Sequence, residues 1–192
     1  MQVSQLTMTK KENAGFSMIE LLIVVAILLI VLAMVIPNMN NMLQNYRALG
    51  DTRGIAAQLA LARMRAASDF TTARLNFSLT ANTYQLEVWS KAANSGVGGY
   101  QLEGGVHSLS QGIFFGFGSV TAPAGSQSTI AQPSPSQITF DSRGFSVDGS
   151  GNPIGTAAIY VQNARGVVCA VSVTLAGQAT ARLYNGSAWS RL

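Results

Sequence analysis

The longest apolar run of the chain lies close to its N-terminus. Sixteen consecutive apolar residues occupy positions 21–36, and the apolar character extends back to Phe16 with Ser17 and Glu20 as the polar interruptions. As a helix rising about 1.5 Å per residue, the segment 16–36 is about 30 Å long, which is the thickness of the hydrocarbon core of a bilayer. This pattern predicts a membrane-spanning helix.

A helical period resumes after Pro37. Apolar residues recur there at steps of three, four and seven, at Met39, Met42, Leu43, Tyr46, Leu49, Ile55, Leu59, Ala62 and Ala66. We expect this continuation to carry one apolar face and to end near Ser68. Residues 50–54 include two glycines, each costing about 1 kcal/mol relative to alanine, so we expect them to loosen the helix. Arg63 and Arg65 are expected on a solvated face.

From Thr72 onward the period changes to two, which is typical of strands with one buried face. The segments that alternate in this way are 73–79, 83–89, 112–117, 137–140, 158–161, 167–175 and 179–184. Turn residues such as those at 141–144 separate them. The predicted fold class is therefore α+β, with a long N-terminal helix, membrane-spanning and then amphipathic, packed on an antiparallel β-sheet head domain.

These patterns divide the chain into a leader (1–15), a hydrophobic membrane and assembly helix (16–37), an amphipathic continuation (38–70) and a β-rich globular head (71–192). The part after the membrane helix, about 155 residues, suits one domain with a single core. Residues 119–136 are rich in serine and proline and poor in large apolar side chains, which predicts a long surface loop. Such a loop is either an insertion without function or a carrier of partner contacts.

The flanking charges predict how the membrane segment is oriented. Lys10 and Lys11 lie on its amino side, and no basic residue follows until Arg47. This bias keeps the leader cytoplasmic and sends the rest across the membrane. An ordinary secretory signal has its small-residue cleavage site after the apolar region, whereas Gly15 comes before it. We therefore expect the apolar segment to stay with the mature chain.

Glu20 is the residue that a plain anchor does not explain. A carboxylate near the end of a spanning helix costs about 2 to 3 kcal/mol on insertion scales, and such groups usually mark function. One interpretation is that Glu20 reaches water at the interface. The other needs a cation: cleavage after Gly15 would create an amino group on Phe16 of every copy. Pairing between Glu20 and Phe16 of the next subunit would offset the burial cost only on assembly.

The run Gly15-Phe16-Ser17-Met18-Ile19-Glu20 and the apolar residues after it resemble the processing site of type IV pilins and type II secretion pseudopilins. The resemblance implies cleavage between Gly15 and Phe16 by a prepilin peptidase, N-methylation of Phe16 and assembly with other subunits through packed N-terminal helices. Pro37 fits the family, in which a proline at this distance kinks the helix. The implied location is the bacterial inner membrane, single-pass with a periplasmic head, and then a pilus or pseudopilus.

The composition agrees with an exported, weakly charged subunit. The formal net charge is +4, a mild basicity that does not by itself argue for nucleic acid. Cys169 is the single cysteine, which excludes an intramolecular disulfide, and its alternation with valines predicts a small buried side chain on a strand. The single histidine, His107, has no partner motif. We expect no catalytic constellation, no metal site and no cofactor.

The loop 148–152 places oxygen side chains at alternate positions, as a calcium loop does. Pro153 stands where an EF-hand loop requires glycine, and no bidentate glutamate follows. The segment is therefore predicted to be a hairpin loop.

The C-terminal half, through residues 138–144, 158–163 and 171–177, resembles the GspH/FimT group of minor pilins and pseudopilins. Some FimT-like members bind DNA through arginines just after the glycine that ends the penultimate strand. That glycine is Gly177 here, and glutamine and threonine occupy the expected arginine positions. Arg182 and Arg191 are nearby and are the candidates for phosphate contact, but they form no basic cluster with aromatic residues. DNA binding is therefore the alternative function rather than the main prediction.

Overall fold

The computed structural model describes residues 15–192, without the side chains of Val35, Pro37 and Asn38. The chain divides into two compact units, one up to Asn40 and the other from Asn41 to Leu192. The predicted leader, including Lys10 and Lys11, therefore lies outside the described residues except for Gly15.

The helix α1 runs from Met18 to Ser68, 51 residues, so it belongs to both units and ends where the sequence predicts. The prediction that residues 50–54 loosen this helix is wrong, because its backbone is helical throughout. Packing explains the difference at Gly54, where an added Cβ would lie 3.3 Å from the Tyr84 hydroxyl. The glycine therefore lets α1 approach the sheet closely, which offsets its low helix propensity.

The head buries one stripe of α1 with alternating steps of four and three residues. Its members are fully buried and comprise Ala48, Thr52, Ile55, Leu59, Ala62 and Ala66. Thr52 is polar, and its hydroxyl donates to the Ala48 carbonyl at 2.7 Å. The prediction of a single apolar face is wrong for the first turns of α1 after Asn41, because Met42, Leu43 and Tyr46 are exposed. They lie on another face of the helix, since successive residues turn by about 100°.

Ten strands and one short 3₁₀ turn follow the helix. They are β1 (Ala73–Ser78), β2 (Thr83–Ser90), η1 (Asn94–Gly96), β3 (Gly99–Ser108), β4 (Ile113–Phe115), β5 (Gln137–Phe140), β6 (Ser146–Val147), β7 (Ala157–Asn163), β8 (Val168–Val173), β9 (Ala179–Tyr184) and β10 (Trp189–Arg191). Strands form in all seven predicted segments, whereas β3, β6 and β10 were not predicted. The α+β class is confirmed.

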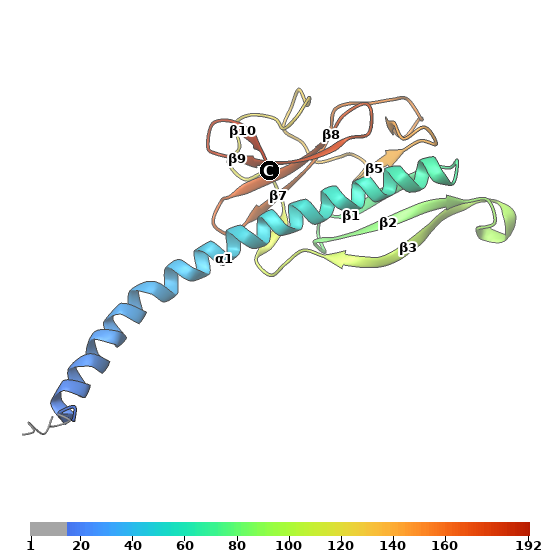
Figure 1. Cartoon of the computed structure of the whole chain (residues 1–192). Coiled ribbons are helices and arrows are strands. Elements are labelled where there is room, and N and C mark those ends of the chain that lie inside the picture. The colour runs from blue at the N-terminus through green and yellow to red at the C-terminus, as the bar shows by residue number, and fades with distance from the viewer. Residues whose placement is uncertain (1–14) are drawn as a thin grey trace, which may run out of the picture. The chain divides into compact units, whose positions relative to one another are not determined.

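The expected single sheet is in fact two antiparallel sheets of five strands. Their orders are β3-β2-β1-β5-β6 and β10-β9-β8-β7-β4. The main core joins apolar residues from the buried stripe of α1 and from both sheets, such as Leu59, Leu75 and Val171. In the view of Figure 1, β2 and β3 of the first sheet lie on one side of this part of α1, and β8, β9 and β10 of the second sheet lie on the other. Each sheet therefore has an inner face toward the core and an outer face away from it.

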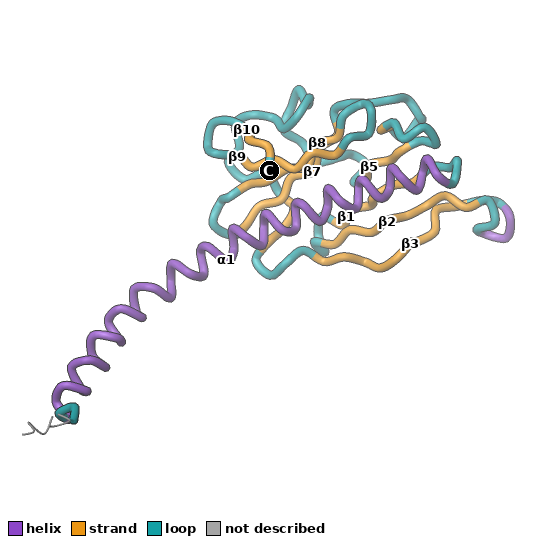
Figure 2. The backbone as a smooth tube through the Cα atoms, in the orientation of Figure 1, coloured by secondary structure: helices purple, strands orange, loops and turns teal. Residues whose placement is uncertain are grey.

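The loop between β4 and β5 covers the outer face of the second sheet. Like the predicted surface loop, it contains no helix or strand, and it is drawn in teal in Figure 2. Val120 and Ala124 of this loop are buried against Tyr160 of β7 in a second apolar cluster. The Tyr160 hydroxyl accepts from the Ala124 amide at 2.9 Å, and Gln132 bonds the Tyr160 backbone. The loop is therefore part of the packed head.

Arg63 and Arg65 are exposed, as predicted for a solvated helix face. Both nevertheless link α1 to the head. Arg63 Nε donates to the Gly144 carbonyl at 3.2 Å, and Arg65 forms an ion pair with Glu103 of β3. These contacts fix the C-terminal end of α1 relative to both strands and turns of the head.

Candidate functional site

The chain around the predicted cleavage site is accessible and lies outside the helix. Gly15, Phe16 and Ser17 precede the helix, which begins at Met18. The Phe16 side chain is 82% exposed, and no described atom lies within 4 Å of a Cβ added to Gly15. The peptide bond between Gly15 and Phe16 thus lies outside regular structure.

Ser17 and Glu20 form the first turn of α1. The Ser17 carbonyl accepts from the amides of Glu20 and Leu21, both at 3.1 Å, which makes Ser17 the N-cap residue. A serine followed three residues later by glutamate is the spacing of a capping box. A carboxylate in the first turn also interacts favourably with the positive end of the helix dipole. Glu20 therefore lies one turn from the Phe16 backbone within its own chain.

The helix that follows is long and apolar enough to cross a membrane, as judged by length and composition. Its side chains are exposed, with values between 43% and 70% for the large apolar residues from Leu21 to Met34. The backbone remains helical through Pro37, whose side chain lies outside the described residues. The predicted kink at Pro37 remains a prediction.

Arg182 and Arg191, the candidate phosphate contacts, lie side by side. The pairing of β10 with β9 puts Arg191 directly opposite Arg182, so the two side chains share the outer face of the sheet. Arg182 Nε donates to Ser172 Oγ at 3.0 Å. Within residues 15–192, neither arginine forms an ion pair. The pair is a local positive charge of two residues.

The remaining chemical candidates have structural roles. Cys169 is fully buried, as predicted, and burial raises the pKa of its thiol. The exposed His107 ring stacks on Tyr84 with 5.3 Å between centroids. The Asp148 carboxylate accepts from the Ser150 and Asn152 amides at 2.8 and 2.9 Å, which confirms a turn. Between Gly15 and Leu192, no three His, Cys, Asp or Glu side chains gather as metal ligands.

Comparison with protein families finds one match at the N-terminus. Residues 10–36 match the family described as the prokaryotic N-terminal methylation motif. The chain carries a prepilin-type N-terminal segment. This match confirms the resemblance seen in the run from Gly15 to Glu20. It covers the last six residues of the leader, the predicted cleavage site and the apolar helix, and it does not extend into the head.

The solved structures similar to this chain include two of the minor pseudopilin EpsH from the type II secretion system of Vibrio cholerae. The first is 14% identical, covers 71% of this chain and 92% of EpsH, and has a TM-score of 0.45. The second is 10% identical, covers 76% and 96% of the two chains, and has a TM-score of 0.39. These scores are too low to establish a common fold. The search of curated proteins found no match.

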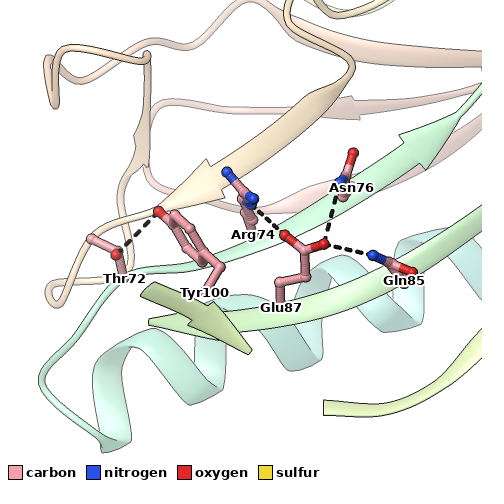
Figure 3. A network of polar contacts seen from close by, with 6 residues as sticks. All are labelled: Thr72, Arg74, Asn76, Gln85, Glu87 and Tyr100. Atoms are coloured by element: carbon pink, nitrogen blue, oxygen red, sulfur yellow. Dashed lines mark hydrogen bonds and ion pairs between the residues drawn. The ribbon is translucent and has the colours of Figure 1, made fainter. Parts of the chain in front are cut away.

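A charged network in the head was not predicted. On the outer face of the first sheet, Glu87 of β2 is only 8% exposed. Its carboxylate accepts from Arg74 Nε and Gln85 Nε2, both at 2.6 Å, and from Asn76 Nδ2 at 3.2 Å (Figure 3). The Arg74 guanidinium also lies 3.7 Å from the centroid of the Tyr100 ring. The sequence did contain a signal for this network, because β1 and β2 both carry polar residues at every second position, Arg74 and Asn76 on β1 and Gln85 and Glu87 on β2.

Burial of Glu87 opposes its ionisation. The hydrogen bonds from Gln85, Arg74 and Asn76, together with the Arg74 charge, outweigh this effect and lower the pKa of Glu87. Tyr100 completes the network through a 3.2 Å hydrogen bond between its hydroxyl and that of Thr72. Because the Glu87 carboxylate accepts three hydrogen bonds, the network fixes the side chains on this face of the sheet.

A groove opens beside the C-terminal end of α1. It has a volume of about 690 Å³ and is lined by residues that follow α1, by the end of β2 and by the first half of β3, including Phe70, Trp89 and Leu102. The Phe70 side chain is 86% exposed, and its backbone has a φ of 49°, which is rare for a bulky residue. Large exposed aromatic side chains in a groove are typical of contact surfaces.

Proposed function

We propose that this chain is a structural subunit, a minor pilin or pseudopilin, of a type IV pilus or a type II secretion filament. One observation carries the proposal: the methylation motif at residues 10–36 coincides with the start of a helix that is long and apolar enough to cross a membrane. The chain would be a substrate of processing enzymes and a component of an assembly, and not itself an enzyme.

Processing would occur in two steps. The prepilin peptidase would cleave between Gly15 and Phe16, and the new amino group of Phe16 would be methylated. The lack of regular structure at residues 15–17 supports this assignment, because the bond precedes the first helical turn and is not held in a helix. Cleavage here removes the leader and keeps the apolar helix.

Glu20 would act in assembly. Glu20 lies in the first turn of α1. In an adjacent, parallel copy shifted along the axis, the Phe16 amino group would come to a similar depth. An ion pair between them would stabilise only subunits in the correct axial register, because an unpaired carboxylate in a membrane costs about 2 to 3 kcal/mol. Pro37 would adjust the course of the helix between its membrane part and the head.

The head would lie in the periplasm before assembly, with α1 holding the subunit in the inner membrane. Within the head, α1 leaves a second face exposed, with alternating steps of three and four residues that are typical of a helix-packing seam. Its members are Leu43, Tyr46, Gly50, Arg53, Ala57, Ala60 and Met64. Small residues in such a seam let another helix approach closely. This face would contact the helices of neighbouring subunits.

The test is quantification of this chain by mass spectrometry in filaments sheared from cells. A minor subunit is expected there in trace amounts relative to the major subunit, whereas a secretion pseudopilin is expected to remain with the inner membrane. Deletion of the gene separates the two systems further: a pseudopilin is required for export of folded enzymes and is dispensable for surface pili. Normal filaments and normal export after deletion would contradict the proposed function.

A further inference from the structure

The two sheets have four edges, and three of them are short. The edge strands β6, β4 and β10 have 2, 3 and 3 residues, whereas β3 has 10. Proteins generally protect sheet edges by shortening them or by placing lysine or proline there. β3 contains neither residue. It is therefore the one long edge strand in the described part of the chain.

The backbone groups of β3 that point outward can be assigned from the ladder. Trp89 of β2 donates its amide to Thr72 at 2.8 Å, which is on the β1 side. The alternate residue Val88 therefore faces β3, where it is opposite Gln101. It follows that Tyr100 and Leu102 turn their N–H and C=O groups away from β2. Within residues 15–192, no group outside the sheet bonds them.

A bulge limits this free edge to the first half of β3. The register with β2 shifts between Gln85 and Leu86, so that Gly104 and Gly105 have no partner and divide the strand. The part before the bulge, residues 99–103, adjoins the groove at Phe70, and Leu102 in the groove is 51% exposed. Free backbone groups and exposed apolar side chains thus occur at one place.

We propose that residues 99–103 of β3 bind an extended segment of a different subunit of the filament, which adds to the sheet as a strand and places an apolar side chain in the groove. A row of unpaired amides and carbonyls is satisfied best by another extended backbone, and adjacent pockets select its side chains. The choice of partner rests on the proposed function. Pairing of two β3 edges would form a closed two-fold dimer, which cannot propagate along a filament.

The first experiment is photocrosslinking of the full-length chain in cells that assemble the filament. The photoreactive p-benzoylphenylalanine replaces Phe70 in the groove, and in a control replaces the exposed Ala164 in the turn between β7 and β8. The expected result is an adduct from position 70 with a different subunit, identified by mass spectrometry, and little adduct from position 164. Equal adducts at both positions, none at position 70, or an adduct with a second copy would overturn the inference.

The second experiment tests backbone pairing in the same crosslinking strain. Leu102→Pro removes an amide that points away from β2, so it leaves the β2–β3 ladder intact, whereas Leu102→Val keeps the amide and an apolar side chain. We expect Leu102→Pro to lower the yield of adduct about two- to tenfold, the effect of one lost hydrogen bond, and Leu102→Val to change it little. Equal yields for the two variants would refute strand addition.

The mature N-terminus is measured in every strain, because it reports on the proposed function independently of the groove. A processed chain that gives no adduct at position 70 contradicts only the inference from β3. An unprocessed chain contradicts the proposed function, and with it the choice of a filament subunit as the partner.

Discussion

Replacement of Arg74 by methionine is the sharpest test of the head's polar network. The substitution keeps an unbranched side chain over Tyr100 and removes the guanidinium. It takes from the nearly buried Glu87 carboxylate one hydrogen bond of 2.6 Å and the positive charge with which it pairs, while Gln85 and Asn76 still donate to it. The folded state then holds a carboxylate that is largely shielded from water and incompletely paired.

The expected loss of stability follows from these contacts. A hydrogen bond to a charged group contributes about 1.5 to 3 kcal/mol, and a partly exposed cation–π contact about 0.5 to 1 kcal/mol. The side chains of Arg74 and Glu87 are 23% and 10% exposed. Water can therefore solvate the Glu87 carboxylate in part after the substitution, which reduces the loss of stability. We therefore expect Arg74→Met to lower the free energy of unfolding by about 2 to 3 kcal/mol, which is near the lower limit for breaking a buried pair.

The assay is urea unfolding of a fragment from Asn41 to Leu192, the compact unit that contains the head. Arg143→Met is a matched control, because Arg143 also pairs with a carboxylate, Asp141 at 2.8 Å, and lies over an aromatic ring, but its side chain is 66% exposed. The control should cost about 0 to 1 kcal/mol. An Arg74→Met effect no larger than that of Arg143→Met would refute the reasoning.

The same network predicts a dependence of stability on pH. The pKa of Glu87 in the folded state is below its ordinary value of 4.5, so the folded state favours the charged form. Its contribution to stability is complete above that ordinary value and is lost as the pH falls through the lower pKa of the folded state. Glu87→Gln should therefore flatten the loss of stability below about pH 4.5. Asp141 and Asp148 also have lowered pKa values and remain in both proteins, so the difference isolates Glu87.

Three further predictions concern other parts of the chain. Glu20→Val should leave the chain in the membrane and block its incorporation into filaments, whereas Glu20→Asp should be incorporated in part. Equal incorporation of the wild type and both variants would contradict the proposed role of Glu20 in setting the axial register. Cys169 should react with iodoacetamide only on unfolding, since its thiol is buried with a raised pKa, and rapid labelling of the folded head would show that this strand opens. The Asn41–Leu192 fragment should bind duplex DNA no better than its double variant Arg182→Ala with Arg191→Ala in fluorescence anisotropy at low salt; tight binding lost in the variant would establish the alternative function.

The parts of the fold with a strong period were predictable from the sequence. The buried positions Ile55, Leu59 and Ala62 recur at helical steps, and strands such as β7 and β8 show dense apolar residues between turns. β3 escaped prediction because Gly104 and Gly105 break its alternation and its side chains are mostly exposed. The division into two sheets also escaped, since strands of either sheet present the same pattern to a shared core.

Long-range contacts account for the other differences. From the sequence, Gly54 is predicted to weaken the helix. In the structure, the hydroxyl of Tyr84, which is distant in sequence, occupies the space beside this glycine. From the sequence, residues 119–136 are typical of a surface loop that packs on nothing, because their burial depends on Tyr160, which lies on a strand later in the chain. The candidate site differs: its residues are contiguous, so Gly15, Phe16 and Glu20 could be recognised as a motif without the fold.

The central claim is that the chain is cut between Gly15 and Phe16 and continues as a methylated subunit. The most direct measurement is the mass of the N-terminal peptide of the chain isolated from membranes and filaments. The predicted result is a peptide that begins at Phe16 and carries one additional methyl group, and that reverts to the uncleaved form in cells without prepilin peptidase. A chain that keeps residues 1–15 in wild-type cells, or one cut after the apolar helix, would contradict the account.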